Sequence, residues 1–282
     1  MNFAICPLSV VSVRRNSFGK SEQLTQLLFG EMVEILEKKG KQWVKIRCTW
    51  DNCIGWVEAR QIKPITPREY EFFRHNFAYS LDLLQPLLAG DHHLPITIGA
   101  QLPGFDGMRF RLDNLTYLFS GQAVFPKNLK PTIDLTLKIA KRYLYAPAQW
   151  GGRSPLGIDS SGFTQLVYKL LGIHLHRQPN QQVVQGHAVD FLSQSQPGDL
   201  AFFENRKGNI FHVGIILPEF ELIHVSGRVR IDKIDHFGIF DSQTQRYTHK
   251  LRVVKRVLPK DKTYFSEKLE VEEVEKKQME LF

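Results

Sequence analysis

The sequence predicts an α+β protein in which two strand-rich segments precede a segment of helices followed by antiparallel strands. The first 64 residues hold short apolar runs separated by turn residues, and a second strand-rich stretch covers 89–127. Beyond residue 128, helical periodicity comes first, and a β-rich stretch follows the turn at 196–199. Helices that are followed by strands, rather than alternating with them, are typical of the α+β class.

Composition and charge narrow the class of protein. The 282 residues suggest about two domains, and 43% hydrophobic and 11% aromatic residues suffice for packed cores. A net charge of +8 would permit nucleic-acid binding, yet lysines and arginines are scattered and form no recognition motif. We therefore expect no nucleic-acid partner, since a basic surface equally attracts peptides that bear carboxylates.

Cysteine usage and hydropathy indicate a reduced protein without a membrane span. Cys6, Cys48 and Cys53 are an odd number without a CxxC pair, so we expect neither a disulfide framework nor a metal site, and no cofactor is implied. The N-terminus does not have the pattern of a signal peptide, and no stretch of about 20 apolar residues could span a bilayer. We expect a cytoplasmic protein or, alternatively, an exported protein whose leader was removed.

Residues 1–64 are predicted to form a small β-barrel. Turn signals at 30–31, 39–41 and 51–52 separate its apolar runs. The expected strands are Val10–Val13, Leu24–Leu28, Met32–Glu37, Trp43–Arg47 and Ile54–Val57. Strands this short and this closely spaced are typical of a small barrel.

A helix and a second barrel are expected next. Thr66, Pro67 and Glu69 form a capping box with proline at the first helical position, which predicts a connector helix over 65–88 that ends near Leu84. A second small barrel is expected over 89–127, with its sharpest turn at 103–107.

The third unit is expected over 128–258. One helix begins at Pro131–Thr132, and a short helix is expected near Val189–Ser193 before the first strand at Leu200–Phe203. The tail at 259–282 is expected to be a frayed or disordered helix, and no function is assigned to it.

A glycine-rich loop from Trp150 runs directly into a short amphipathic helix, which Gly172 is placed to end. The buried face of that helix is predicted from Leu166, Val167, Leu170 and Leu171. Its first turn holds Asp159, Ser160 and Ser161. A helix N-terminus offers free backbone N–H groups and the positive end of the helix dipole, which favour a developing anion. A cysteine there would be a ready nucleophile, but the residue is serine.

Two histidines in the β-rich stretch have the spacing of a catalytic pair. His212 and His224 lie six residues on either side of Pro218. If the hairpin reverses at that proline, they lie directly opposite one another on one face, with Cβ atoms about 4.5–5.5 Å apart. A nucleophile on a helix N-terminus, a base on a strand and a group that orients the base suit acyl transfer. Either histidine alone could equally be a packed strand residue. Three other histidines have no partner at a comparable spacing: His92, His93 and His187.

The string from Trp150 to Gly162, with Asp-Ser-Ser-Gly at its end, closely resembles the NlpC-type (NlpC/P60) cell-wall cysteine peptidases, papain-like enzymes that cut bacterial murein stem peptides. In that family the position of Ser160 is the nucleophilic cysteine. The resemblance implies that His212, in His-Val-Gly, is the base and that His224 orients it.

The first barrel carries a second resemblance. Ser21-Glu22, the run 26–31 and Gly55-Trp56-Val57 resemble the bacterial SH3-like domains that precede the catalytic domain in murein-peptide-recycling members of the family. The implied architecture is a papain-like cysteine peptidase domain preceded by two small SH3-like β-barrels.

The resemblance also implies substrate-binding residues in the first barrel. In that subgroup a glutamate and a tyrosine of this barrel bind the amino end of the substrate. Glu22 matches the glutamate, whereas Cys53 holds the tyrosine position, and Trp50 replaces that tyrosine only if its loop is rearranged. Glu22 could instead be a solvated carboxylate at a strand edge.

Three further binding residues are implied around the nucleophile position. Asp159 and Ser161 would bind the free amine and the γ-linked glutamate, and Trp150 would form a wall of the pocket. From the residues alone, Asp159 has a rival role as a helix N-cap, and Trp150 could be a core residue.

The implied reaction is hydrolysis of the bond between γ-D-glutamate and the diamino acid in L-Ala-γ-D-Glu-diamino acid peptides with a free N-terminal amine. We expect no membrane partner, and a monomer or weak oligomer. Because a serine hydroxyl is far less acidic than a thiol, we expect the Ser160 form to be inactive or very weak.

Several interpretations stay open at this stage. The chain is a peptidase whose cysteine has been replaced, a natural pseudoenzyme that binds murein peptides, or a working serine peptidase. A fourth possibility is an adaptor whose two barrels bind extended peptides without cleaving them.

Overall fold

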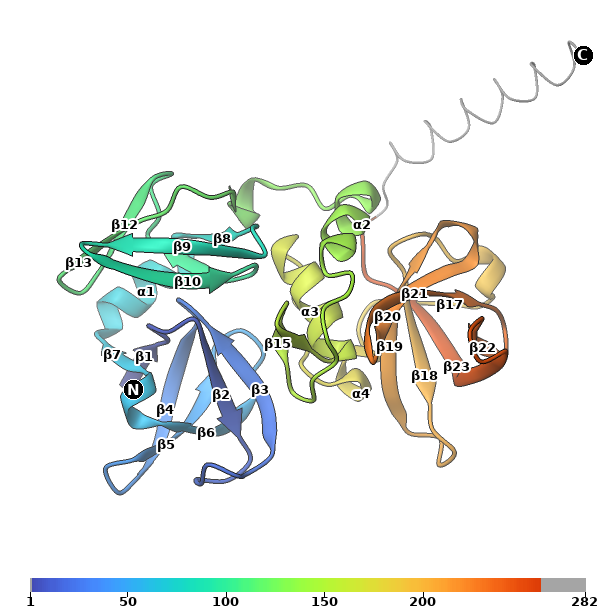
Figure 1. The fold of residues 1–282 in the computed structure, drawn as a ribbon, viewed down its shortest axis with the longest axis horizontal. Helices are drawn as coiled ribbons and strands as arrows, with labels where there is room; N and C mark the ends of the chain where they lie inside the picture. The colour runs from blue at the N-terminus through green and yellow to red at the C-terminus, as the bar shows by residue number, and fades with distance from the viewer. Residues whose placement is uncertain (1, 260–282) are drawn as a thin grey trace, which may run out of the picture.

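The computed structural model describes residues 2–259 and places three β-rich units side by side (Figure 1). The first β unit is one sheet with the strand order β3-β2-β6-β5-β4-β1-β7. Its strands are β1 (Asn2–Ile5), β2 (Val10–Arg14), β3 (Gln23–Leu28), β4 (Met32–Lys39), β5 (Trp43–Cys48), β6 (Ile54–Glu58) and β7 (Lys63–Ile65). The five predicted strands are all present close to their predicted bounds, and β1 and β7 add to them.

The connector helix is shorter than predicted. α1 (Pro67–His75) begins at the expected capping box, where Thr66 Oγ1 accepts a hydrogen bond from the backbone N–H of Glu69. It ends at His75, because the Asn76 amide donates to the Phe72 carbonyl and the chain then enters a strand that pairs on both sides. The expectation of a helix to Leu84 and of a connector over 65–88 is therefore wrong.

The second β unit accordingly starts at Phe77 rather than at residue 89. It consists of two sheets with the orders β10-β9-β13-β12 and β11-β8-β14. Its strands are β8 (Phe77–Ser80), β9 (Leu84–Ala89), β10 (His92–Thr97), β11 (Gln101–Pro103), β12 (Arg109–Leu112), β13 (Leu115–Leu118) and β14 (Ala123–Val124). Aromatic rings fill the space between the two sheets, including Phe105, Phe110 and Phe119.

The third unit begins with helices, as predicted. They are α2 (Ile133–Arg142), α3 (Ser160–Leu170) and α4 (Pro179–Gln182), and β15 (Arg153–Ser154) pairs with β16 (Gly157–Ile158) between the first two. Asp159 caps α3 by accepting a hydrogen bond from the Gly162 N–H at 2.7 Å. Gly172 follows the helix with φ +75°, a left-handed conformation that suits glycine, so its predicted role in ending α3 is confirmed.

The β-rich end of the chain forms a barrel. The strand order is β17-β23-β18-β19-β20-β21-β22, and pairing of β22 with β23 closes six of these strands on themselves. The strands are β17 (His187–Val189), β18 (Leu200–Glu204), β19 (Ile210–Leu217), β20 (Glu221–Ser226), β21 (Arg228–Ile234), β22 (Gly238–Asp241) and β23 (Arg246–Arg256). The short helix expected at 189–193 is wrong, because His187–Val189 pairs with β23 and only a 3₁₀ turn at Leu192–Gln194 follows.

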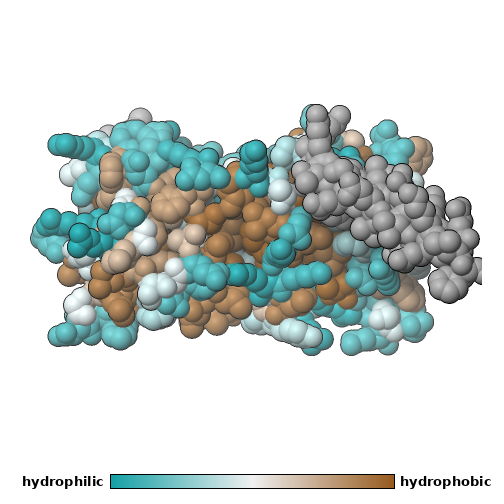
Figure 2. Space-filling model, turned by 90° about the horizontal axis from the view of Figure 1, so that it is seen from above, coloured by the Kyte–Doolittle hydropathy of each residue, from teal (hydrophilic) through white to brown (hydrophobic). Residues whose placement is uncertain are grey.

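Helix α3 lies between the two N-terminal β units and the barrel (Figure 1), and all of its residues are buried. Its apolar side chains share one core with Leu28, Tyr79 and Ile98 of the β units and with Val213 and Ile223 of the barrel. Seen from above, apolar surface gathers over the middle of the molecule (Figure 2). The start of α3 is thus held by all three units.

A buried ion cluster joins the three units at α3. Glu31 of the first unit accepts hydrogen bonds from Arg153 at 2.8 and 2.9 Å and from Lys169 Nζ at 2.5 Å. Lys169 also donates to the Gly99 carbonyl of the second unit and faces the ring of Tyr79 at 4.7 Å. Burial raises the pKa of Glu31, but the two cations outweigh it and lower the pKa to about 2. The Glu31 carboxylate is therefore charged at neutral pH.

Within residues 2–259, no helix has the length and apolar character needed to cross a membrane. Cys6, Cys48 and Cys53 are free thiols. The prediction made for the tail concerns residues that, from 260 onward, lie outside the described part of the chain.

Candidate active site

Ser160 is the first residue of α3 and is only 8% exposed. Among the described residues its hydroxyl has no hydrogen-bond partner, whereas its two neighbours, Asp159 and Ser161, are both engaged. Ser160 therefore lies at the positive end of a buried helix with its side chain uncommitted.

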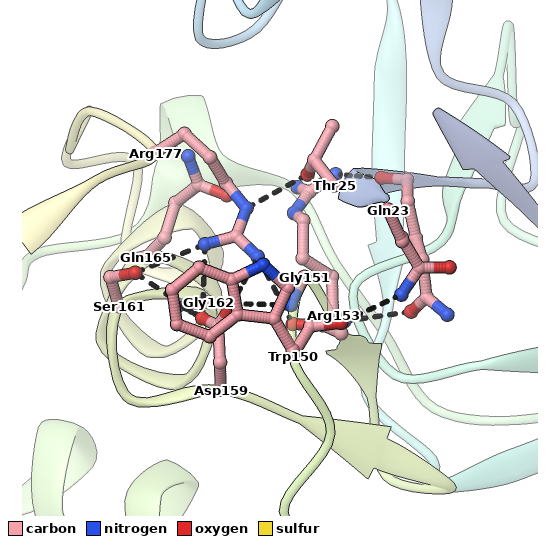
Figure 3. Close-up of polar contacts among 12 residues, drawn as sticks. Gln23, Thr25, Trp150, Gly151, Arg153, Asp159, Ser161, Gly162, Gln165 and Arg177 are labelled. Atoms are coloured by element: carbon pink, nitrogen blue, oxygen red, sulfur yellow. Dashed lines mark hydrogen bonds and ion pairs between the residues drawn. The ribbon is translucent and has the colours of Figure 1, made fainter. Parts of the chain in front are cut away.

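The Asp159 carboxylate is held by groups of its own chain (Figure 3). Besides capping α3, it accepts hydrogen bonds from the Gly151 N–H at 2.9 Å and from the Ser161 hydroxyl at 3.2 Å. Arg177 adds two parallel contacts of 2.9 and 2.6 Å to its two oxygens. The N-cap role that the sequence offered as an alternative is thus present, and any amine that met Asp159 would share an already paired carboxylate.

Arg177 is a site residue that the sequence did not predict. Its guanidinium is buried and also donates to Thr25 Oγ1 of β3 at 2.8 Å and to Ser161 Oγ at 3.0 Å. It therefore ties the start of α3 to the first β unit. Only its neighbours in space distinguish it from the other arginines, so no local sequence signal could have identified it.

The histidine hairpin differs in register from the prediction. Ile215 pairs with Ile223 and Leu217 with Glu221, so the chain reverses around Glu219 rather than at Pro218. His212 and His224 are consequently diagonal neighbours on one face and not directly opposite. The residue opposite His224 is Gly214, by continuation of this register.

Gly214 explains how the two rings can meet. A Cβ at this position would lie 2.8 Å from Leu222 Cγ and 2.9 Å from His224 Cβ, closer than real Cβ contacts. The missing side chain leaves room for the His224 ring, whose Nδ1 lies 2.9 Å from His212 Nε2.

A carboxylate completes the chain of contacts. Asp232 Oδ2 lies 2.8 Å from His224 Nε2, and its other oxygen accepts a 2.6 Å hydrogen bond from Arg230. A carboxylate only accepts, so His224 Nε2 carries the proton and its Nδ1 accepts from His212 Nε2. Neutral His212 is thereby left with an unprotonated Nδ1, the form that a general base requires. Asp232, like Arg177, was not predicted.

Burial keeps His212 neutral. Burial, followed by charge on His224 and His249, lowers the pKa of His212 well below its ordinary value. Burial raises the pKa of Asp232, but the hydrogen bonds from His224 and Arg230 lower it overall. The series of hydrogen bonds therefore ends in the neutral imidazole of His212 on one side and in the negatively charged carboxylate of Asp232 on the other.

His249 of β23 is a third ring against this pair. Its centroid lies 4.3 Å from that of His212, and Phe211 stacks on it at 5.5 Å. Three register shifts, at which Phe211, Thr248 and Arg252 are the extra residues, surround this point of the barrel. Such bulges redirect side chains near binding sites, and they explain why periodicity alone did not place His249 here.

Helix α3 packs against β19 and β20, the strands that carry His212 and His224. Gln182 of α4 donates to the Ser161 carbonyl, and the next residue, Val183, lies beside Ile210, two residues before His212. On the other side, Ala148 in the loop before Ser160 donates to the Gly227 carbonyl, three residues after His224. No hydrogen bond joins Ser160 to His212 in the described structure, which is common in unliganded sites.

Three other predicted residues share a cleft between the first β unit and the third unit. Glu22, Cys53 and Trp150 line a cavity of about 510 Å³ that Arg177 also borders. Trp150 Nε1 donates to Glu22 at 3.0 Å, and Arg15 pairs with the same carboxylate at 2.6 Å. Glu22 is an exposed carboxylate that pairs with Arg15 and contacts Trp150, so the predicted binding role and the alternative of a solvated carboxylate at a strand edge both remain.

Cys53 occupies the position at which the resemblance implies a tyrosine, so the cleft has no phenol there. Burial, followed by the charge of Asp51, raises the pKa of the Cys53 thiol to about 12, so the thiol is neutral. Trp50 does not replace the tyrosine, because its ring packs against Tyr79 and His174. His92, His93 and His187 lie on β10 and β17 and join none of these contacts.

Comparison with known proteins gives separate matches for the first β unit and the third unit. Residues 146–253 match the NlpC/P60 family, and residues 13–62 match the bacterial dipeptidyl-peptidase SH3 domain. A γ-D-glutamyl-L-lysine dipeptidyl-peptidase of Bacillus cereus is 29% identical over 71% of this chain and 66% of its own length. The protein of the same name from Bacillus subtilis is 26% identical over 71% of each chain.

A solved structure supports the arrangement of the fold. An NlpC/P60 family protein from Bacillus cereus superposes with a TM-score of 0.77 at 22% identity, covering 91% of this chain and all of the other. The chain thus carries an NlpC/P60 domain behind a bacterial SH3 domain.

Proposed function

We propose that this chain binds murein stem peptides of the type L-Ala-γ-D-Glu-diamino acid, and that its site is built to hydrolyse the bond between γ-D-glutamate and the diamino acid. The observation that supports the proposal is the series of hydrogen bonds from Asp232 through His224 to His212, which leaves an unprotonated Nδ1 on a strand that packs against α3. Two dipeptidyl-peptidases named for a γ-D-glutamyl-L-lysine substrate are relatives over most of the chain.

The proposed reaction uses a thiol at position 160. His212 Nδ1 takes the thiol proton, and the sulfur attacks the γ-carbonyl carbon of the glutamate. Backbone N–H groups at the start of α3 stabilise the resulting oxyanion. His212 then gives its proton to the leaving amine, and water hydrolyses the thioester. With the Ser160 hydroxyl, the first proton transfer is unfavourable, so this form holds its peptide uncut.

The cleft between the first β unit and the third unit would bind the amino end of the peptide. Glu22 and Trp150 line it, and Cys53 would contact the peptide as a neutral thiol. Arg177, which also lines the cleft, donates to Asp159 and Ser161. Recognition of a free amine would suit peptides already released from the wall, inside the cell. A pure binding protein is the second candidate, favoured by the serine at position 160 itself.

The test compares the Ser160 chain with Ser160→Cys on L-Ala-γ-D-Glu-L-Lys and on the diaminopimelate peptide, with products identified by mass spectrometry. We expect release of the diamino acid by the cysteine form alone. The matched control, Ser160→Cys with His212→Ala, should release none. If Ser160→Cys folds and binds the peptide but cuts neither substrate, the peptidase part is wrong and the binding protein remains.

A further inference from the structure

A second cavity, distinct from the cleft at Glu22, opens at the end of the barrel. It measures about 1020 Å³ and lies between the β18–β19 loop and strands β22 and β23. Three aromatic side chains in its wall are unusually open to solvent: Phe211 is 44%, Phe237 60% and Tyr247 50% exposed. We call this cavity the aromatic groove. Solvent-exposed aromatic rings gathered around a concavity are typical of a binding surface.

The aromatic groove reaches the catalytic pair. His249 lines it and packs on His212 with 4.3 Å between ring centroids, and Phe211, which precedes His212 in the chain, lines it as well. The Glu22 cleft shares no lining residue with it. His249 and Phe211 thus place the aromatic groove beside His212 and apart from the cleft proposed for the amino end of the peptide.

The charge of the aromatic groove is positive. Glu204, the one acidic lining residue within 2–259, is paired with Lys250 at 2.7 Å and with Arg252 at 3.4 Å. Arg206, also in the lining, makes no ion pair within the described residues, so its charge is available to a ligand. Lining residues of this kind suit a segment with small apolar side chains that ends in a carboxylate.

We propose that the aromatic groove binds the part of the peptide on the carboxyl side of the scissile bond, with apolar side chains on the rings and a terminal carboxylate at Arg206. The inference rests on the proposed function and extends it. It assigns the residues beyond the diamino acid a binding site, so that longer stem peptides are held more tightly than the tripeptide.

The test uses calorimetric titration of the full Ser160 chain, which by the proposed function holds its peptides uncut. The ligands are L-Ala-γ-D-Glu-L-Lys, the same peptide extended by two D-alanines, and the extended peptide with a terminal amide. We expect the extended acid to bind about tenfold more tightly than the tripeptide, and the amide to lose most of that gain.

Variants of the aromatic groove test whether the tighter binding of the extended acid depends on its lining residues. Phe237→Ala, Tyr247→Ala and Arg206→Gln should each reduce affinity for the extended acid and leave the tripeptide affinity unchanged. The matched control is Tyr145→Ala, an exposed aromatic outside the aromatic groove, which should alter neither affinity. The inference is wrong if the tripeptide and the extended acid bind equally tightly. It is also wrong if all three variants keep the full increase in affinity for the extended acid. In either case, binding of the tripeptide would still support the proposed function. Failure to bind any of the peptides overturns both.

Discussion

At the scale of single residues, the geometry assigns Asp232 the task of deciding which nitrogen of His212 is free. It does so through His224, because each ring nitrogen in the chain must be a donor or an acceptor and only the carboxylate end is fixed. An asparagine can donate as well as accept, so it no longer enforces that order.

We therefore expect Asp232→Asn, made in the Ser160→Cys chain, to lower kcat by roughly 10²–10⁴-fold with little change in KM. Steady-state kinetics measure both values. Asp106→Asn, on an exposed turn of the second β unit, is the control and should change neither. An Asp232→Asn enzyme with the kcat of its parent would show that the orientation of His212 does not depend on this carboxylate.

His249 supports the same base by contact. Burial, followed by charge on His224, lowers its pKa to about 4, so at neutral pH it acts as an uncharged ring. We expect His249→Ala in the Ser160→Cys chain to reduce kcat about tenfold, and His249→Phe to restore most of it, because phenylalanine keeps the packed ring. Kinetics of the two variants side by side decide the matter. A His249→Phe enzyme as slow as His249→Ala would mean that a ring nitrogen, and not packing, is what matters.

At the scale of elements, the start of α1 was more predictable than its end. The caps at Thr66, Thr132 and Asp159 are hydrogen bonds between residues that are close in sequence, and all three are present. The end of α1 depends on strands β11 and β14, which are distant in sequence and pair with Phe77–Ser80. Helical periodicity in Phe77, Leu81 and Leu84 could not reveal those partners.

In the site, too, features local in sequence were predictable and contacts between distant elements were not. The positions of Ser160, His212 and His224 follow from spacing within one helix start and one hairpin, and only the register was wrong. That error arises because Glu219 and Phe220 both adopt positive φ, near +59° and +53°, and carry the turn past Pro218. Arg177, Asp232 and His249 come from other elements, so no local pattern pointed to them.

Gly214 is the hairpin residue on which the histidine contact depends. Gly214→Ala would place a methyl group 2.9 Å from His224 Cβ, so the two strands or the ring must move. We expect a loss of about 1–3 kcal/mol in the free energy of unfolding, seen as a lower Tm by circular dichroism. Gly208→Ala tests the same substitution in a loop where a Cβ meets no atom, although its φ of +78° carries its own strain. A Gly214→Ala protein that is as stable as its parent would contradict the close approach described here.

At the scale of the whole molecule, the cluster of Glu31, Arg153 and Lys169 holds the three units together. Replacing the carboxylate leaves two buried cations with only carbonyl partners and without the anion that pairs with both. We expect Glu31→Gln to cost about 3–5 kcal/mol of unfolding free energy, measured by urea denaturation. Glu58→Gln, which removes an exposed pair with Arg60, should stay within about 0.5 kcal/mol of the parent. Similar losses in the two variants would show that the cluster adds nothing beyond a surface pair.

The same carboxylate predicts a pH dependence. Its pKa is lowered from 4.5 to about 2, so its contribution is fully present above about pH 4.5 and is lost as the pH falls toward 2. That shift corresponds to about 3 kcal/mol. Urea denaturation at pH 6, 4 and 3 should show the parent protein and Glu31→Gln converging in stability as the pH falls. A difference that stays constant over this range would mean that the pKa of Glu31 is the same in the folded and the unfolded protein.

The buried cluster also restricts how a gene for such a protein can be rearranged. One lysine on α3 is satisfied by a carboxylate from the first β unit and a carbonyl from the second, so each unit supplies a group that the others cannot replace. A recombination event that brought in a foreign first unit without a carboxylate at this point would strand two cations in the interior. We expect the three units to be inherited as a block, in contrast to modular proteins whose binding domains are exchanged freely among lineages.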